Sequence, residues 1–366
     1  MTVLCIAGDP GGSRAVLPVA ERLAQRLGVE RVLIAAHGTL GRECPERLRP
    51  CLTEIPDVAT GPFLLARGVA CVVFGTSTHD AVPLRVARAA QAVGCRTLHV
   101  LDNWSNYRSR LEVDGGPLLV PDLYTAMDQT AYDEAVAAGI PAANVVIAGQ
   151  PALAETAVCE PARQAEQARA LGLPAGRRIL LFISEPFRLV FGDDTAAAGH
   201  PGFTEDQVLD QLLRALQPHA DGVHVAVLPH PKQSADEIAR QVEGARGAVS
   251  AGVLRVAVGS TALAAAHAVV GMASILLYQA WLAGLPCLSI QPCRRAPFLA
   301  YVDRLADMCH ARAWQEVPAG VQRLLDNNFR KALTYESHRS LHQRSPDLIA
   351  QAVLSMVPGL STEERL

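Results

Sequence analysis

The sequence has no pair of cysteines spaced as CxxC and no cluster of cysteine and histidine. Its nine cysteines are odd in number, scattered, and mostly placed inside apolar runs such as "ARGVACVVFG". This distribution argues against a structural zinc site and against a disulfide framework. It favours reduced cysteines packed in a core, so we expect no bound metal.

An excess of basic residues is also missing, with 33 Lys and Arg against 36 Asp and Glu. Binding a nucleic-acid backbone needs a surplus of positive charge, so we expect no nucleic-acid partner. No apolar run is long enough to cross a bilayer, and the start "MTVLCIAGD" lacks the regions of a secretory signal. We expect a cytoplasmic protein that is at most peripherally bound to a membrane, with a homodimer as one open oligomeric state.

Apolar runs that alternate with helix-period segments fill most of the 366 residues, of which half are hydrophobic. Apolar strands separated by crossover helices are typical of a parallel sheet that is covered on both faces. We predict strands in these runs: "TVLCIAG", "RVLIAAHG", "ACVVFGTS", "RTLHVLDN", "LYTAMDQ", "NVVIAG", "RILLFIS", "VHVAVLPHP", "VLRVAVG", "AAHAVVGMAS" and "LPCLSIQ".

The length exceeds what one hydrophobic core usually supports, and a proline-containing polar segment follows the sixth run. We therefore predict an α/β protein with two Rossmann-like domains facing a cleft, residues 1–152 and 153–334. A helix over about 335–358 is expected to pack back on the first domain. In such folds the loops at the carboxyl ends of the strands carry the function.

Two loop regions of the first domain carry polar groups at strand ends. The first turns into a helix through Asp9, Gly11 and Gly12, so that helix amides can hold a sugar hydroxyl or an anion. A plain strand-to-helix turn is the alternative for this loop. The second region joins the ends of neighbouring strands and contains Ser77, His79, Asp80, Asp102, Asn103, Trp104 and Tyr107.

An attacking hydroxyl needs a base to take its proton, because its pKa lies far above 7. We name three catalytic candidates, Asp102, His79 and Asp9, while capping of a helix or turn is the alternative for Asp102 and Asp80. The other polar groups are candidates for binding the acceptor: Gly11, Gly12, Ser77, Asn103, Trp104 and Tyr107.

Three loops of the second domain carry candidate ligands for a donor phosphate. Glu185 and Arg188 follow "LLFIS", and the arginine fork either binds a phosphate or pairs with a neighbouring acid. His230 stands between two prolines, where it can donate a hydrogen bond to a leaving phosphate. The remaining candidates are Pro231 and Lys232 beside it, and Gly271, Ser274 and Gln279 around the start of a later helix.

Short motifs in this order resemble those of GT-B glycosyltransferases and of the related UDP-N-acetylglucosamine 2-epimerases. The motifs are Gly271-x-x-Ser274, Gln279-Ala280 and Gly284-x-Pro286, with "TLHVLDNWSNYRSR" and the segment ending in "IAGQP". In those families the helix commonly carries Glu where this chain has Gln279. The resemblance covers most of the chain and implies a nucleotide-activated sugar as substrate, held mainly by the second domain.

Two further motifs bear on the choice among these relatives. The epimerases carry a His-Arg pair where this chain has Ser184-Glu185-Pro186, which argues against an epimerase. "LPHPK" is similar to the His-Pro motif of bacterial sialyltransferase-like and Kdo transferase-like enzymes, in which the His contacts the phosphate of a CMP-activated sugar. His230 and Pro231 would be that motif.

The resemblance implies an inverting, metal-independent glycosyltransferase that moves a sugar from a nucleotide donor to a hydroxyl of a carbohydrate or glycoconjugate. The donor would be a CMP-activated acidic sugar, or otherwise a UDP-sugar. Such enzymes need no cofactor because helix dipoles and basic side chains neutralise the leaving phosphate. Two alternatives stay open: a nucleotide-sugar epimerase or hydrolase, and a non-catalytic protein that binds sugar nucleotides.

Overall fold

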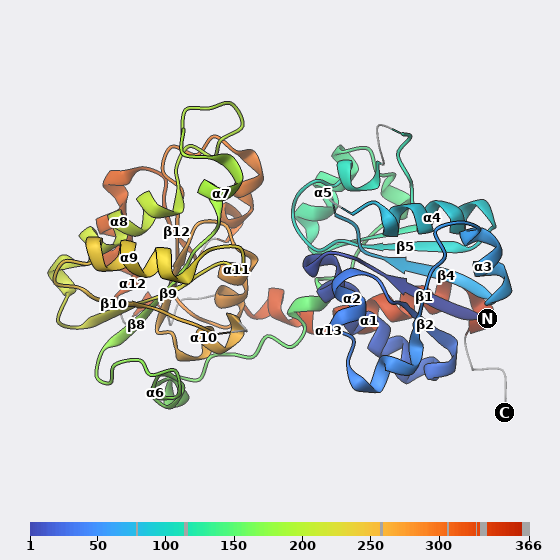
Figure 1. The fold of residues 1–366 in the computed structure, drawn as a ribbon, viewed down its shortest axis with the longest axis horizontal. Helices are drawn as coiled ribbons and strands as arrows, with labels where there is room; N and C mark the ends of the chain where they lie inside the picture. The colour runs from blue at the N-terminus through green and yellow to red at the C-terminus, as the bar shows by residue number, and fades with distance from the viewer. Residues whose placement is uncertain are drawn as a thin grey trace. The chain divides into compact units, whose positions relative to one another are not determined.

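Two parallel sheets, each with its own helices, make up the protein in a computed structural model (Figure 1). The structure describes residues 1–77, 80–112, 116–256, 259–305, 307–326, 328–329 and 335–360. The chain divides into unit 1, Met1–Glu155 with His338–Leu366, and unit 2, Thr156–Ser337. The predicted fold class, an α/β protein with two parallel-sheet domains, is confirmed.

Unit 1 holds a seven-stranded sheet in the order β3-β2-β1-β4-β5-β6-β7. Because the order runs outward from β1 on one side and from β4 on the other, the topological switch point lies between these two strands. The strands are β1 (Thr2–Ile6), β2 (Val32–Ala35), β3 (Leu52–Thr53), β4 (Val69–Phe74), β5 (Arg96–Val100), β6 (Leu123–Ala126) and β7 (Val145–Ile147). The helices are α1 (Pro10–Leu27), α2 (Gly38–Arg42), α3 (Thr60–Ala66), α4 (Val82–Ala92) and α5 (Gln129–Ala137).

Unit 2 holds a six-stranded sheet in the order β10-β9-β8-β11-β12-β13, with its switch point between β8 and β11. The strands are β8 (Arg178–Ile183), β9 (Val223–Leu228), β10 (Ser250–Val253), β11 (Ala268–Gly271), β12 (Cys287–Ile290) and β13 (Cys309–Ala311). The helices are α6 (Pro161–Ala170), α7 (Phe187–Phe191), α8 (Glu205–Ala215), α9 (Ala235–Ala245), α10 (Gly259–Ala265), α11 (Ile275–Leu282) and α12 (Val317–Leu324).

The strand predicted in "VLRVAVG" was placed too late in the chain. β10 ends at Val253, and its register pairs Ser250 with His224 and Val253 with Val227 of β9. The pairing partner therefore decides the position of this edge strand, whereas the apolar run itself continues beyond it.

Helix α13 (Glu336–Met356) returns to unit 1 and lies beside α1 (Figure 1). Arg26 of α1 donates hydrogen bonds to Gln351 at 2.9 Å and to Asp347 at 2.8 Å. The apolar face of α13 joins the core of unit 1 through Ile349, Ala350 and Val353, none of which is exposed.

Replacing Ile349 by Ala should lower the free energy of unfolding by about 2–5 kcal/mol, because the deletion leaves a cavity in this core. Leu348, the neighbour on the same helix, is 37% exposed and makes a matched control, with an expected loss below about 1 kcal/mol on change to Ala. Urea unfolding followed by circular dichroism measures both. Equal midpoints for the two variants would contradict a core role for α13.

Candidate functional site

Two carboxylates and two glycines meet where β1 and β5 end in unit 1. Asp9 caps α1, and its Oδ1 accepts a hydrogen bond from the Gly12 amide at 3.3 Å. A Cβ on Gly11 would lie 2.3 Å from Oδ2 of Asp102 and 3.4 Å from Oδ2 of Asp9. Burial and the neighbouring charge of Asp102 raise the pKa of Asp9. The structure thus brings together four of the predicted residues.

Asp102 forms an ion pair with Arg110, whose side chain is 6% exposed. The Arg110 guanidinium also donates to the backbone carbonyl of Ser105 at 3.0 Å. Behind the pair, the side-chain amide of Gln150 donates to the Asp102 carbonyl at 2.8 Å. Asp102 is therefore held rigidly, with Oδ1 committed to Arg110.

A histidine and an aspartate that follow β2 and β4 also meet at this edge. Nε2 of His37 lies 2.8 Å from Oδ2 of Asp80. Oδ1 of Asp80 accepts from the Val82 amide at 3.0 Å, so this carboxylate also fixes the start of α4. A Cβ on Gly8 would lie 1.5 Å from Oδ2 of Asp80, so the pair lies directly over the bare Cα of Gly8.

The predicted acceptor-binding side chains have partners inside unit 1. The Trp104 indole donates to Asp128 at 2.8 Å, and the Tyr107 hydroxyl donates to Glu134 at 2.6 Å. Oδ1 of Asn103 accepts from the Trp104 amide at 2.8 Å. Ser77 accepts from the backbone amide of Asp80 at 3.1 Å, and the catalytic candidate His79 lies outside the described residues.

In unit 2, Glu185 follows β8, and its carboxylate lies against the turn that leads into α11. Its Oε1 accepts from the amides of Met272 at 3.1 Å and of Ala273 at 2.7 Å. The turn is held from the other side, because the Met272 carbonyl accepts from Ser289 at 2.6 Å. Burial raises the pKa of Glu185 to about 7, against the opposing pull of the amides. A carboxyl group thus already holds the amides that the sequence analysis assigns to a phosphate.

Hydrogen bonds fix the orientation of His230 after β9. Its backbone amide donates to Gln233 at 2.9 Å, and Nδ1 accepts from the Lys232 amide at 3.2 Å. Because Nδ1 accepts, the neutral ring carries its proton on Nε2 and can donate from there. Burial and the nearby Lys232 lower the pKa of His230, which favours this neutral ring. The Gln233 side chain in turn donates to Glu205 at 2.9 Å.

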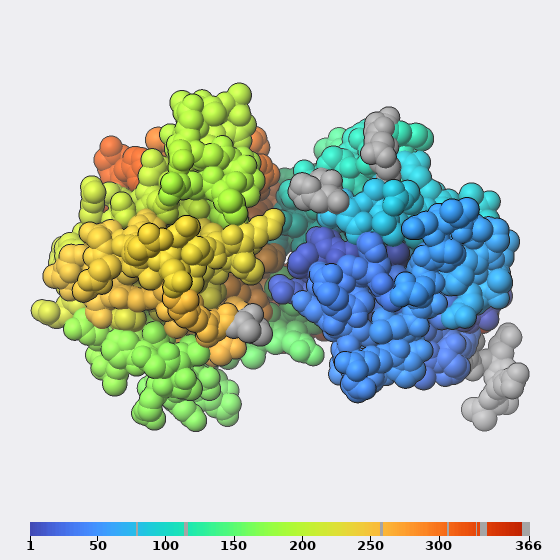
Figure 2. Space-filling view, viewed as in Figure 1, coloured from blue at the N-terminus to red at the C-terminus, as the bar shows by residue number. Residues whose placement is uncertain are grey.

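Arg188 lies on a projection of unit 2 that α7 and the following loop form (Figure 2). Its guanidinium pairs with Asp193, and with Asp206 at 3.0 Å, and the side chain is 56% exposed. This is the ion pair that the sequence analysis left as the alternative to a phosphate ligand. Arg188 and Lys232 both line a hollow of about 780 Å³ beside the ends of β8 and β9.

The third predicted loop divides between a strand and a helix. Gly271 is the last residue of β11, whereas Ser274 caps α11 and accepts from the Leu276 amide at 3.1 Å. Gln279 donates to Thr156 at 3.4 Å. Since β8 and β11 flank the switch point, Glu185 and Ser274 belong to one edge of the sheet, and His230 follows β9, the strand next to β8.

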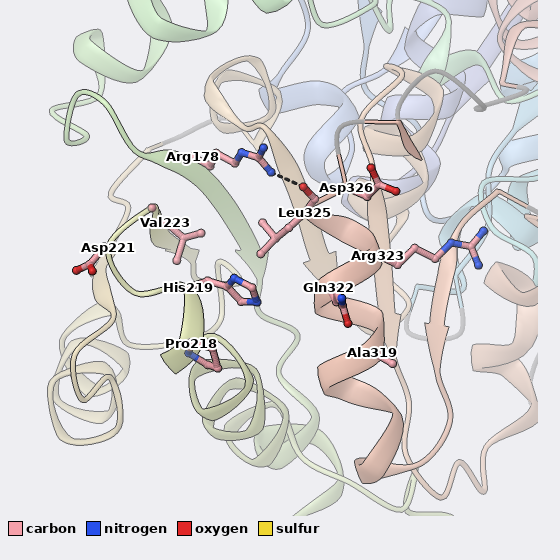
Figure 3. Close-up of a pocket in the computed structure, with 11 residues that line it drawn as sticks. Arg178, Pro218, His219, Asp221, Val223, Ala319, Gln322, Arg323, Leu325 and Asp326 are labelled. Carbon is pink, nitrogen blue, oxygen red and sulfur yellow. Dashed lines mark hydrogen bonds between the residues drawn. The ribbon is translucent and has the colours of Figure 1, made fainter.

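Another hollow, of about 840 Å³, lies at the opposite edge of the same sheet, where β8 and β9 begin (Figure 3). It is lined by Arg178, His219 and Arg323, among others, and Arg178 is hydrogen bonded to the Leu325 carbonyl there. None of the predicted site residues reaches it. Volume alone does not bring functional groups together, and the candidate ligands of this unit instead follow the carboxyl ends of β8, β9 and β11.

Sequence reasoning missed His37, Arg110, Glu205 and Gln233. His37 had a local signal, because it ends the apolar run "RVLIAAHG" just before a helix. Arg110 and Glu205 lie in helical segments and reach their partners through tertiary packing, whereas Gln233 follows His230 in the same loop.

Metal-binding side chains do not gather in groups of three or more in the part of the chain that the structure describes. The cysteines are free, and most are buried. Within the same described ranges, no helix is both long and apolar enough to span a membrane.

No family model and no curated protein matches the sequence. Solved structures match its fold. HepE of Anabaena in complex with UDP and glucose has a TM-score of 0.62 at 15% identity, over 98% of this chain and 100% of that chain. The UDP-GlcNAc 2-epimerase from Neisseria meningitidis bound to UDP-GlcNAc has a TM-score of 0.67 at 11% identity, over 97% of this chain and 100% of that chain. A glycosyltransferase from Rickettsia africae has a TM-score of 0.63 at 12% identity, over 99% of each chain. The fold is therefore that of GT-B-like proteins.

Changing Glu185 to Gln should remove one component of the pH dependence of stability. The folded-state pKa of about 7 lies above the ordinary 4.5, so the folded protein binds this proton more tightly. The proton on Glu185 therefore stabilises the folded protein below pH 4.5, and this contribution is lost as the pH rises through 7. The free energy of unfolding should fall by about 3 kcal/mol at most over this range. Urea unfolding at pH 5 and 8 measures the difference. Equal pH dependence in both proteins would refute the raised pKa.

Proposed function

We propose that this protein binds a UDP-activated sugar at the carboxyl edge of the unit 2 sheet and transfers the sugar to a hydroxyl acceptor. The observation that carries the proposal is the fixed orientation of His230, which leaves Nε2–H as a hydrogen-bond donor beside the switch point. A donor in this position can stabilise the negative charge that develops on a leaving diphosphate.

The donor site that we propose comprises His230, Ser274 and Gln279, with Lys232 at its rim. Ser274 and Gln279 belong to the turn and helix that follow β11, next to β8, which Glu185 follows. Glu185 adds a condition, because its carboxylate holds two amides of that turn. A diphosphate would bind there more readily when Glu185 is protonated, since this removes the repulsion between like charges.

UDP is preferred to CMP as the nucleotide. HepE is described in complex with UDP and with UDP-glucose, and the Neisseria epimerase is bound to UDP-GlcNAc. The His-Pro motif alone supports the CMP-sugar alternative.

The acceptor would bind at the carboxyl edge of the unit 1 sheet. Asp9 and Asp102 offer carboxylate oxygens for sugar hydroxyls, and Gly11 and Gly12 leave room for close approach. Asn103 is a further candidate contact. We propose direct displacement without a metal, so that the configuration at the transferred carbon inverts.

A 2-epimerase is the second candidate function. It is favoured by the epimerases among the structural neighbours and by the Glu185 carboxyl, whose pKa of about 7 suits proton exchange. NMR of UDP-GlcNAc incubated with the protein alone separates the two functions. Inversion at C2 of the sugar without UDP release supports an epimerase, whereas release of UDP in the presence of glycan acceptors supports transfer.

UDP should raise the melting temperature more than CMP, GDP or dTDP at equal concentration, because a ligand that binds only the folded protein stabilises it by mass action. A thermal-shift assay with each nucleotide at about 1 mM measures the difference. A larger shift with CMP would reverse the assignment of the nucleotide, and no shift with any of them would contradict a nucleotide-sugar substrate.

His230→Ala should weaken UDP binding or donor turnover at least ~10-fold, the scale of one charge-assisted hydrogen bond. The control is His219→Ala, which changes a histidine in the hollow at the opposite edge and should leave UDP affinity unchanged. Isothermal titration with UDP measures both variants. Loss of affinity in His219→Ala with none in His230→Ala would move the donor site to the amino edge.

A further inference from the structure

The contact between His37 and Asp80 determines which nitrogen of His37 can accept a proton. An ionised carboxylate only accepts hydrogen bonds, so the 2.8 Å contact to Oδ2 requires the hydrogen on Nε2 of His37. The neutral ring then has its free lone pair on Nδ1. Among the described residues, no hydrogen bond engages that nitrogen, and the His37 side chain is 33% exposed.

We propose that His37 is the general base that takes the proton of the acceptor hydroxyl, with Asp80 as its positioning residue. The inference rests on the proposed function and adds a proton acceptor to it. His37 follows β2 and Asp80 follows β4, which flank β1 and lie at the switch-point edge of unit 1. The backbone holds the loop in place, because the Thr39 amide donates to the Gly8 carbonyl at 2.7 Å.

The other candidate bases at this edge are already engaged. Oδ1 of Asp102 is paired with Arg110, and Oδ1 of Asp9 accepts from the Gly12 amide. Both carboxylates are better suited to holding hydroxyl groups than to removing a proton from one.

His230 in unit 2 is the informative contrast to His37. Its Nδ1 accepts from a backbone amide, which leaves Nε2–H as a donor. His37 instead donates to a carboxylate, which leaves Nδ1 as an acceptor. Both neutral rings thus carry the hydrogen on Nε2, but the nitrogen left for a ligand differs: Nδ1 of His37 can receive a proton, whereas Nε2–H of His230 can stabilise a negative oxygen.

In the proposed step, the acceptor oxygen forms a bond to the anomeric carbon of the UDP-sugar. The bond from that carbon to the diphosphate oxygen breaks, and its electron pair leaves with UDP. The hydroxyl proton passes to Nδ1 of His37, and the Asp80 carboxylate stabilises the resulting imidazolium before the proton moves to solvent.

The test compares the full-length protein with His37→Gln, using UDP-glucose and UDP-GlcNAc as donors and water as the probe acceptor. Released UDP gives turnover, and titration with UDP gives donor affinity. The side chain of His37 makes no cap hydrogen bond to α2, so the variant should keep its fold. We expect turnover to fall at least about 100-fold while UDP affinity changes less than about twofold. His219→Gln, in unit 2, is the control and should keep its turnover.

The outcomes separate this inference from the proposed function. If the turnover of His37→Gln stays within about threefold of that of the parent protein, the role of His37 is overturned and the proposed function still stands. A parent protein that releases no UDP from either donor would overturn glycosyl transfer, and the base role with it.

Asp80→Asn provides a readout that a merely structural role would not move. Without the carboxylate, nothing holds the His37 ring with Nδ1 toward the acceptor, so kcat with water should fall at least about tenfold while the KM for the donor changes less than about twofold. Asp9, Asp102 and Arg110 lie at the same edge and are unchanged in this variant. An unchanged kcat, or a change in KM alone, would remove Asp80 from this role.

Discussion

The bare Cα of Gly8 sets how closely the loops after β1, β2 and β4 approach one another. Any side chain there would occupy the position of the Asp80 carboxylate, and the Gly8 carbonyl also anchors the amide of Thr39. Gly11 has the same effect one turn further on, where Asp102 approaches the backbone. The polar edge of unit 1 therefore depends on volume left empty by two glycines as much as on its charged groups.

The switch point of unit 2 differs from that of unit 1, because the amides before α11 donate to a carboxyl group of the same chain. Glu185 satisfies the turn before α11, and Glu205 lies close enough to contribute to the raised pKa. In this arrangement the amides that could bind an anion already have a partner, the carboxyl group of Glu185. Binding of a diphosphate at neutral pH would be coupled to a proton on Glu185.

The two sheets and most of the strands could be predicted because apolar runs with β-branched residues are a local property of the sequence. The strand ends carrying Asp9, Asp102 and His230 could be found for the same reason. Most partners could not: Arg110 reaches Asp102 through the fold, and Arg188 pairs with the more distant Asp206 as well as with the neighbouring Asp193. The packing between helices and strands decides which polar groups become partners, and the periodicity of the sequence holds no information about that packing.

Helix α13 has a consequence for how the protein is made. Unit 1 lacks part of its core until Ile349 and Val353 have been synthesised, and the Gln150 amide also awaits Nδ1 of His342. Unit 2 is complete in sequence before that point. On the ribosome the second domain can thus finish folding first, while the first exposes an apolar groove along α1 and waits for its last helix.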